Sequence, residues 1–304
     1  MLTGFVLPGG TATEQLRQAV LAEESGWDGV FVWEAAFGVD AWSLLAAMAA
    51  RTQRIRLGTL LTPLPWRRPW KVASQVATVD QLSGGRAILS VGVGALDTGL
   101  PYTGEETDKR LRAERLDEGI DLIRTLWDGR LSYHGDFYDF ECDRDDLIGA
   151  VRPVSGRIPI WVVGVWPRPK SMRRVLRCDG VIPQYNLDGR DAEPDDARAV
   201  RAWLTEHGGS PDLDVVAEGE TPRTTRVQPR PRSRPGPGAG APGGSRTAGC
   251  CPRAPRIPWR WSGNGWLPVR PPLQVAEQRL AVRRAEPASV PDEIAVVGEV
   301  CVAR

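Results

Sequence analysis

Short apolar runs alternate with amphipathic segments along the first 220 residues of the chain. The apolar runs are residues 2–8, 26–34, 55–65, 86–94, 158–164, 179–184 and 212–220. Between them, residues 13–25, 40–52, 69–82, 111–127, 170–177 and 192–207 carry apolar side chains at helical spacing. The pattern predicts seven strands alternating with six helices. Strands that are apolar on both faces are typical of a parallel sheet covered by helices.

The ends of the predicted elements carry matching signals. Thr13 and Asp40 are expected N-caps, and a proline stands at the entry of the helix over 69–82. Gly84 and Gly85 fit a helix C-cap and the turn that follows it. The stretch "RLSYHGDFYDF" alternates like a hairpin and interrupts the strand and helix order.

An open doubly wound sheet and a closed (β/α)8 barrel both fit this order, and the spacing of about 30 residues per unit favours the barrel. Polar residues or glycines recur near the predicted strand ends, namely Glu34, Thr62, Gly94, Gly164, Gln184 and Glu218. In a barrel these residues meet on one rim, where active sites of that architecture lie. For each residue alone, the alternative is that it merely ends a strand.

The glycines of "DQLSGGRAILSVGVGALDTG" raise the question of a nucleotide-binding loop. The stretch contains Gly-x-Gly without the third glycine in register, and it follows the fourth strand. A Rossmann fingerprint is therefore not indicated. Glycine at a strand exit instead lets the backbone approach a phosphate or a flat ring.

Several of these stretches together resemble the bacterial luciferase-like flavin-dependent oxidoreductases, the luciferase-like monooxygenase family. The resemblance covers about residues 1–220. It rests on the order of "GWDGVFVWE", the long stretch from "RTQRIRLGTLLTPLP" to "RAILSVGVG", "LIRTLWDG", "YHGDFYDF" and "IPIWVVG...RRVLRCDGVIP". The resemblance implies a (β/α)8 barrel that holds FMN or the deazaflavin coenzyme F-420 (F420) at its carboxyl-end rim. Members transfer a hydride or activate oxygen to oxidise a small organic substrate.

The resemblance also implies site residues. In the family the third strand commonly ends in a non-prolyl cis peptide behind the ring, which here falls within Thr59, Leu60 and Leu61. The other matching cofactor positions are Glu34, Thr62, Val93, Gly94, Thr98, Gly164, Lys170 and Ser171. Lys170 and Ser171 begin a helix, where free backbone donors and a cation can hold phosphate. A solvated surface role is the alternative for Lys170.

The chain departs from one branch of the family. Deazaflavin-dependent sugar phosphate dehydrogenases place a histidine after strand two and a glutamate after strand four, where this chain has Ala35 and Ala95. His134 lies in the predicted hairpin, away from the rim. Glu34 is therefore the one candidate catalytic carboxylate, as cofactor ligand or base. Trp33, Trp66 and Trp166 are expected to form an aromatic pocket for an apolar substrate.

An enzyme without a catalytic histidine at the rim remains consistent with this family, because the cofactor carries the difficult step and the protein supplies orientation and water exclusion. Two alternatives stay open. One is a protein that binds flavin or deazaflavin without turnover, and the other is an inactive relative altered at its C-terminal end.

Composition changes abruptly near Pro222. Residues 223–304 contain fourteen arginines, no lysine and five acids, a net charge of +9, so the overall charge of +1 leaves −8 for residues 1–222. The later segment is rich in proline and glycine, lacks periodicity and is predicted to be irregular or disordered. One interpretation is a basic tail that contacts nucleic acid or anionic surfaces.

We favour another interpretation, a change of reading frame near residues 222–226. Arginine, proline, glycine and alanine have the most GC-rich codons, so an out-of-frame reading of a GC-rich gene produces this mixture. On that interpretation the domains are an incomplete barrel over 1–222 and an unrelated tail over 223–304. The eighth strand and last helix are lost, which predicts unpaired edges on the first and seventh strands.

The remaining features limit location and partners. Apolar stretches are too short to cross a bilayer, and "MLTGFVLPGG" lacks a basic leader region, so a cytoplasmic location is the default. The five cysteines form no CxxC pair, which argues against a zinc site or a disulfide scaffold. We expect a small organic substrate, no metal, no membrane and no nucleic-acid partner, and a homo-oligomer stays open.

Overall fold

The computed structural model describes residues 2–154, 156–187, 190, 192–219, 259–262, 265–268 and 298–303. The chain divides into two compact units. One is Met1–Val227 together with Ile294–Arg304, and the other is Gln228–Glu293. In the second unit the described residues form one antiparallel hairpin of β11 (Trp259–Ser262) and β12 (Gly265–Pro268).

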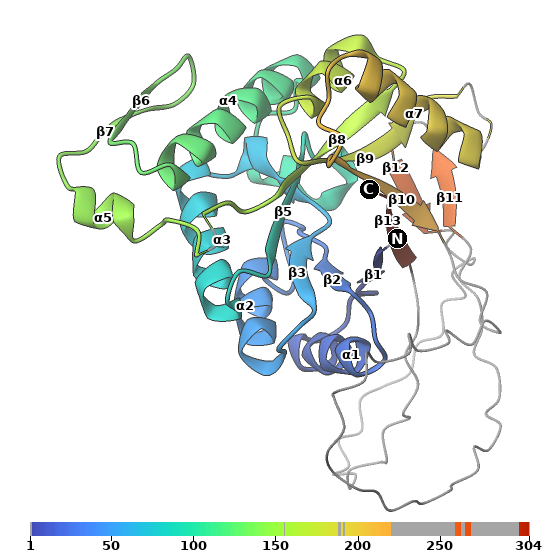
Figure 1. The fold of residues 1–304 in the computed structure, drawn as a ribbon, viewed down its shortest axis with the longest axis horizontal. Helices are drawn as coiled ribbons and strands as arrows, with labels where there is room; N and C mark the ends of the chain where they lie inside the picture. Colours follow the sequence, from blue (N-terminus) through green and yellow to red (C-terminus); the bar gives the residue numbers. More distant parts are fainter. Residues whose placement is uncertain are drawn as a thin grey trace, which may run out of the picture. The chain divides into compact units, whose positions relative to one another are not determined.

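The first unit has the alternating order that the apolar pattern predicts (Figure 1). Its strands and helices begin with β1 (Leu2–Val6), α1 (Ala12–Glu24), β2 (Gly29–Val32), α2 (Ala41–Arg51), β3 (Arg56–Thr59), β4 (Thr62–Pro63), α3 (Pro69–Ser83) and β5 (Ala87–Gly92). They continue with α4 (Lys109–Trp127), β8 (Ile160–Trp166), α6 (Pro169–Val175), β9 (Gly180–Tyr185), α7 (Pro194–Glu206) and β10 (Asp214–Gly219). The predicted α/β architecture is confirmed.

Local signals explain most helix ends. The Asp40 carboxylate accepts a hydrogen bond from the Ser43 amide at 2.7 Å and caps α2. Gly84 ends α3 in the left-handed region, with φ 70°. The expected cap at Thr13 is wrong: Thr11 caps α1 in a capping box with Glu14, because Glu14 lies three residues after Thr11 and each side chain bonds the other's backbone amide.

The strands of the first unit close into a ring. Seven strands pair in parallel in the order β1, β2, β3, β5, β8, β9 and β10. The short β4 also pairs in parallel with β5. The eighth place is taken by β13 (Gly298–Ala303), which pairs antiparallel with both β1 and β10. In the part of the chain that the structure describes, no parallel strand and helix follow β10.

The expected unpaired edges on the first and seventh strands are therefore wrong. Five residues of β1 and five of β10 lie opposite residues of β13. Backbone N–H and C=O groups are obligatory hydrogen-bonding groups, so any extended segment that reaches both edges satisfies them, whatever its direction. Most of the predicted tail over 223–304 lies outside the described residues.

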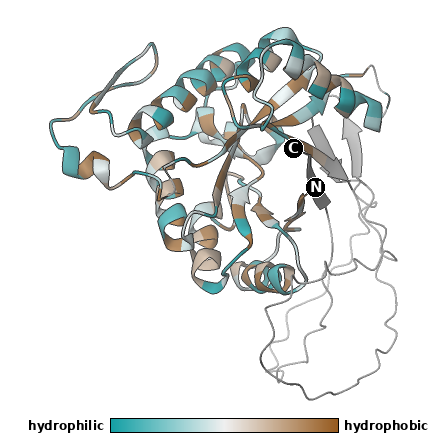
Figure 2. Ribbon diagram, in the orientation of Figure 1, coloured by the Kyte–Doolittle hydropathy of each residue, from teal (hydrophilic) through white to brown (hydrophobic). Residues whose placement is uncertain are grey.

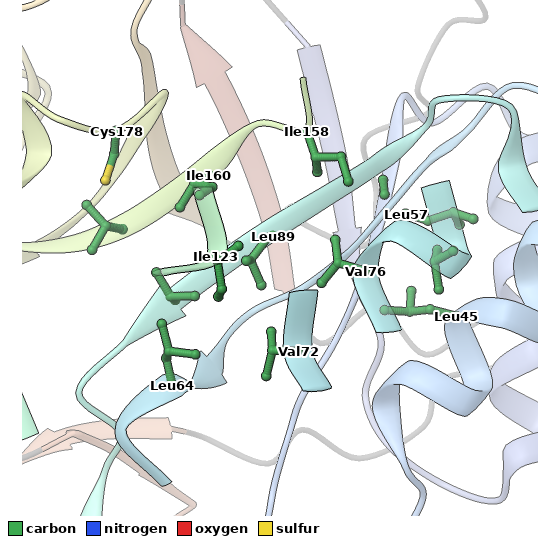
Figure 3. Packing of buried hydrophobic residues seen from close by; sticks show 14 of the residues in the cluster. Leu45, Leu57, Leu64, Val72, Val76, Leu89, Ile123, Ile158, Ile160 and Cys178 are labelled. Carbon is green, nitrogen blue, oxygen red and sulfur yellow. The ribbon is translucent and has the colours of Figure 1, made fainter. Parts of the chain in front are cut away.

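Two apolar layers hold the barrel. Inside it lie the buried side chains of Val6, Phe31, Ile88, Trp161, Ile182 and Val216. A larger cluster fills the space between strands and helices, and Figure 3 shows part of it, with Leu57 and Leu89 from strands against Leu45, Val72 and Ile123 from helices. Hydropathy colouring shows apolar and polar segments alternating along the same helices (Figure 2). None of the described helices is long and apolar enough to cross a bilayer.

The predicted hairpin is confirmed as an excursion between α4 and β8. It consists of β6 (Ser132–His134) and β7 (Asp139–Glu141), followed by the short α5 (Asp145–Gly149), and it projects from the barrel in Figure 1. The Glu118 carboxylate on α4 accepts the backbone amides of Phe137 and Tyr138 at 2.7–3.0 Å. This contact fixes the hairpin tip against the helix layer.

Candidate functional site

A chain of hydrogen bonds joins the carboxyl ends of β2, β3 and β5. The Thr62 hydroxyl donates to Glu34 Oε2 at 2.6 Å, and Thr59 Oγ1 lies 3.0 Å from Thr62 Oγ1. Thr59 also lies 3.3 Å from the Ser90 carbonyl oxygen. Because its hydroxyl donates to Glu34, Thr62 can only accept from Thr59, whose single hydroxyl proton is shared between Thr62 Oγ1 and the Ser90 carbonyl. Three of the predicted cofactor positions, Glu34, Thr59 and Thr62, are thus brought together.

Arg67 forms an ion pair with Glu34 Oε1. The Glu34 side chain is only 6% exposed and that of Arg67 is 23% exposed, so both charges are largely removed from water. Burial lowers the pKa of Arg67 from its ordinary value, yet a guanidinium remains ionised. Arg67 also donates to the Gln75 side chain at 2.8 Å, which fixes its position. The pair keeps the buried carboxylate charge-compensated.

A cis peptide bond joins Leu60 and Leu61, within the three residues that the family resemblance indicated. It separates β3, which ends at Thr59, from β4, which begins at Thr62. The apolar run over 55–65 is consequently two strands where the pattern predicted one. Leu61 lies over β5, because a Cβ built on Gly92 would be 3.0 Å from a Leu61 methyl carbon.

The exit of β5 is packed from both sides. Gly94 has φ +80°, and a Cβ there would lie 2.3 Å from the Trp66 ring. Arg112 on α4 is buried, donates to the carbonyls of Val93 and Gly94 at 3.0 and 2.9 Å, and stacks on Trp66 with 4.9 Å to the ring centroid. The Trp66 indole N–H donates to the Glu106 carbonyl at 2.6 Å. Glycine is therefore required at position 94 by packing as well as by φ.

Thr98 joins the loop after β5 to the loop after β2. Its carbonyl accepts the Ala36 amide at 3.3 Å, and its hydroxyl donates to the Ala95 carbonyl at 2.8 Å. The side chain of Val93 packs against the cluster between strands and helices. Of these two predicted cofactor positions, Thr98 thus lies on a loop beside the one that carries Glu34, whereas Val93 has its side chain against the core and its carbonyl bound to Arg112.

Gly164 lies inside β8, which the structure extends through Trp166, and not after the strand as the pattern indicated. A Cβ on Gly164 would be 2.9 Å from Val175 and 3.1 Å from Met172 Sδ, so this position faces α6. The Ser171 hydroxyl oxygen accepts the Val165 amide at 2.9 Å.

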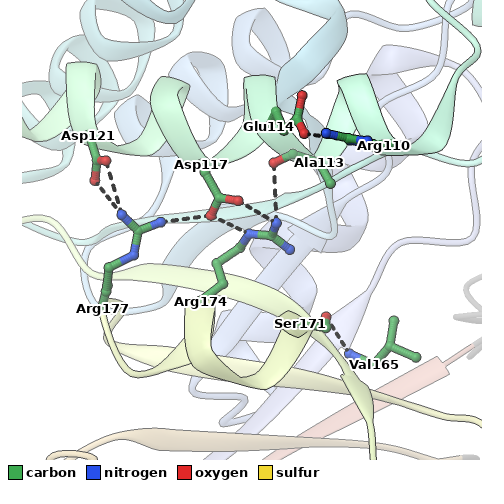
Figure 4. A network of polar contacts seen from close by, with 9 residues as sticks. All are labelled: Arg110, Ala113, Glu114, Asp117, Asp121, Val165, Ser171, Arg174 and Arg177. Atoms are coloured by element: carbon green, nitrogen blue, oxygen red, sulfur yellow. Dashed lines mark hydrogen bonds and ion pairs between the residues drawn. The ribbon is translucent and has the colours of Figure 1, made fainter. Parts of the chain in front are cut away.

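α6 is held to α4 by a network of ion pairs (Figure 4). Arg174 donates to both oxygens of Asp117 at 2.7 Å, and Arg177 bridges Asp117 and Asp121 at 2.7–3.1 Å. Bidentate pairs of this kind fix geometry well. They set the position of Ser171 and of the exposed Lys170 at the start of α6.

The three tryptophans expected to form one pocket have different surroundings. Trp66 is 5% exposed and belongs to the packing beneath the β5 exit. Trp166 lies edge-on to Trp203 of α7, with ring centroids 6.4 Å apart. Trp33 alone of the three is well exposed, at 51%. His134 is an exposed hairpin residue away from the rim, as its position in the sequence suggested. Its Nδ1 lies 2.8 Å from Asp139 Oδ2.

Sequence reasoning missed Arg67 and Arg112. Both are buried or half-buried arginines whose partners come from other elements. The signal for Arg67 is its place in "TPLPWRRP", where an arginine ends the short apolar 3-10 turn Leu64–Trp66 that follows the strand. Arg112 has no such signal, because it stands among other charged residues on α4.

Comparisons with known proteins identify the family and the fold of the chain. The model of the family described as luciferase-like monooxygenase matches residues 3–222. The chain is 39% identical over 135 residues to an F420-dependent glucose-6-phosphate dehydrogenase of Amycolatopsis mediterranei, covering 41% of this chain and 40% of that protein. It is 31% identical over 165 residues to a 5,10-methylenetetrahydromethanopterin reductase of Archaeoglobus fulgidus, covering 53% and 46%. The chain therefore spans about half the length, or less, of these relatives.

Solved structures of the same fold include an F420-dependent secondary alcohol dehydrogenase in complex with an F420–acetone adduct, with a TM-score of 0.56, 22% identity and coverage of 71% of this chain and 68% of that one. Another is the oxygenating constituent of 3,6-diketocamphane monooxygenase from Pseudomonas putida in complex with FMN, with a TM-score of 0.56, 24% identity and coverage of 70% and 64%. At this identity the likeness concerns the fold. Because the family model covers well over half of the chain, the protein belongs to the luciferase-like monooxygenase family.

Proposed function

We propose that this protein is a flavin- or deazaflavin-dependent oxidoreductase or monooxygenase that acts on a small organic substrate at the carboxyl end of the barrel. The observation that carries the proposal is the buried chain from Thr59 through Thr62 to Glu34, with Arg67 behind the carboxylate. A buried charged pair costs desolvation, and such clusters gather where a site needs fixed polar groups.

The residues present fit the proposed cofactor. The pyrimidine edge of FMN or F420 presents N–H donors and carbonyl acceptors in alternation. The Glu34 carboxylate can accept from such an N–H, while the fully buried Thr59 and Thr62 hydroxyls hold the carboxylate in place. The partly buried Leu60 and Leu61 supply apolar side chains beside them. When bound, such a ring supplies hydride transfer or oxygen activation.

The residues of the chain then bind, orient and exclude water. Arg67 pairs with Glu34 Oε1, and the Thr62 hydroxyl donates to Glu34 Oε2, so the orientation of the carboxylate is fixed. With alanine at positions 35 and 95, Glu34 is the residue we assign to any proton acceptance at this rim. The assignment makes Glu34 a cofactor ligand or a base.

The other proposed cofactor contacts lie on neighbouring elements. Val93, Gly94 and Thr98 follow β5, and Gly164, Lys170 and Ser171 lie on β8 and at the start of α6. Lys170 is exposed and is the proposed contact for an anion, whereas Gly164, as a glycine, has only backbone atoms to contribute. We retain a cytoplasmic location as part of the proposal.

Titration with FMN and with F420, followed by fluorescence, tests the cofactor. We expect one of the two to bind with a dissociation constant in the micromolar range or below, about −8 kcal/mol or better. Glu34→Gln should weaken this binding by tenfold or more, because it removes the charge that Arg67 balances. Glu114→Gln, which alters an exposed pair with Arg110, is the matched control.

The outcomes separate the candidate roles. Turnover with a small alcohol, ketone or aldehyde in the presence of the bound cofactor supports the enzyme. Binding of the ring without hydride transfer or oxygen consumption supports a non-catalytic binding protein. Binding of a nicotinamide cofactor alone contradicts both.

We also propose that the family domain ends near residue 222 and that a change of reading frame lies at 222–226. The family match ends at residue 222, where charge and composition change. Translation of the other two frames downstream should give a strand and a helix with apolar periodicity. Early stop codons in both frames would overturn this proposal and leave residues 223–304 as a genuine extension.

A further inference from the structure

Large apolar side chains are exposed on two loops at the carboxyl end of the barrel. Trp33 is 51% exposed and Phe37 71% exposed on the loop after β2. Leu96 is 51% exposed and Tyr102 88% exposed on the loop after β5. Exposed apolar groups that gather on one surface mark a binding site more often than isolated ones do.

The two loops are in direct contact. The Ala36 amide donates to the Thr98 carbonyl at 3.3 Å. The Phe37 ring lies against Gly99, because a Cβ built on that glycine would be 3.4 Å from a ring carbon. The two loops that carry these four side chains are therefore in contact, and we call the exposed Trp33, Phe37, Leu96 and Tyr102 the apolar lip. Trp33 directly precedes Glu34, so the lip adjoins the proposed site.

The charges around the lip do not suit an anion. Residues 33–40 and 94–104 contain no lysine or arginine, and they carry the acids Glu34, Asp40 and Asp97. The nearby cations are already engaged: Arg67 pairs with Glu34, and Arg112 donates to strand carbonyls beneath the loop. Phosphate esters are usually held by arginine or lysine side chains.

We propose that the apolar lip binds an uncharged, largely apolar organic molecule as the substrate and disfavours phosphorylated sugars. This inference rests on the proposed function. It assigns to this chain a substrate class different from that in the name of its glucose-6-phosphate dehydrogenase relative. It also replaces the expected trio of tryptophans, because only Trp33 of that trio faces solvent beside the site.

The test is the affinity of the full chain for 1-butanol, 1-hexanol and 1-octanol, measured by calorimetry with and without the bound cofactor. Each added methylene should tighten binding about threefold to fourfold, as expected for burial of CH₂ groups. Glucose 6-phosphate should bind at least tenfold more weakly than 1-octanol. The double variant Phe37→Ala with Tyr102→Ala should reduce 1-octanol binding fivefold or more.

Leu147→Ala is the matched control, because Leu147 is 56% exposed on α5 outside both loops. An affinity that does not rise along the alcohol series, or an equal loss in the control, overturns the inference. So does an oligomer of the wild-type chain that the double variant dissociates, since the lip would then be an interface between copies. FMN and F420 titrations on the same samples report separately on the proposed function. If cofactor binding is unchanged but alcohol affinity does not rise with chain length, only the inference about the apolar lip is rejected.

Discussion

The barrel is joined differently on its two sides. On the site side, β2, β3 and β5 pair in parallel, and side chains reinforce the pairing from neighbouring elements. On the closing side, β1 and β10 meet through β13, an antiparallel strand that follows β10 by about 80 residues of chain. The site side is therefore specified by local units and their side chains, whereas the closing side depends on backbone pairing with a distant segment.

Two side chains illustrate the reinforcement of the site side. The Glu23 carboxylate accepts the backbone amides of Gln53, Arg54 and Ile55 at 2.7–3.0 Å, before β3. Burial opposes ionisation of Glu23, but these amides outweigh it and lower its pKa. Arg86, just before β5, donates to carbonyl groups from the turn that precedes β3. Such bonds tie consecutive β/α units together at the base of the barrel.

The largest effect is expected from removing the closing strand. A chain without residues 298–304 loses five paired positions on each of two edges. At roughly 0.5–1 kcal/mol per hydrogen bond, we expect the free energy of unfolding to fall by about 5 kcal/mol. Urea unfolding monitored by circular dichroism measures the change, and a chain lacking only Arg304 is the control. An unchanged midpoint would show that the barrel does not depend on β13.

Arg86→Ala should produce the next largest loss. Its guanidinium donates to the carbonyls of Ser83, Ala49, Thr52 and Ile55 and to the Thr52 hydroxyl, at 2.6–3.1 Å. Leaving these acceptors unpaired should lower the unfolding free energy by about 3 kcal/mol. Arg110→Ala removes an exposed pair and should leave the unfolding free energy nearly unchanged. Equal effects of the two variants would mean that side chains do not reinforce the site side.

Gly94→Ala tests the packing at the exit of β5. The added methyl would lie 2.3 Å from Trp66 at a positive φ, so we expect a loss of about 2–3 kcal/mol together with weaker cofactor binding. Gly9 also has a positive φ, +93°, but a Cβ added there would have no atom within 4 Å. Gly9→Ala should therefore lower the free energy of unfolding by only about 1 kcal/mol. If both variants lose the same stability, contact with Trp66 does not explain the glycine.

The smallest effect concerns alkaline pH. Burial raises the pKa of the Cys178 thiol from 9.0 to about 11. Between these values the unfolded chain releases a proton that the folded chain keeps, so stability should fall with rising pH, by about 1 kcal/mol at pH 10. Cys178→Ala should reduce this decline relative to wild type over pH 9–11, measured by urea unfolding. An identical pH dependence in both proteins would contradict the assignment to Cys178.

Much of the site side could be predicted from the sequence. The alternation of strands and helices, the Asp40 cap and the Gly84 terminus are local, because they depend on residue types within one turn or strand. The Leu60–Leu61 bond was placed within three residues by family resemblance, since its position follows the strand that precedes it. Glu34 and Thr62 were both identified as strand-end residues, and parallel strands bring such ends to one rim.

The tertiary structure alone decided what these residues contact. The pairing of Arg67 with Glu34, the burial of Arg112 against Trp66, and the orientation of Gly164 toward α6 depend on side-chain directions across separate elements. The closing of the ring by β13 depends on two backbone edges that no residue pattern records, because any extended chain can satisfy them. The sequence determined the β/α units and their order through local periodicity and caps, whereas long-range packing determined the partners of each buried charge and the strand that completes the barrel.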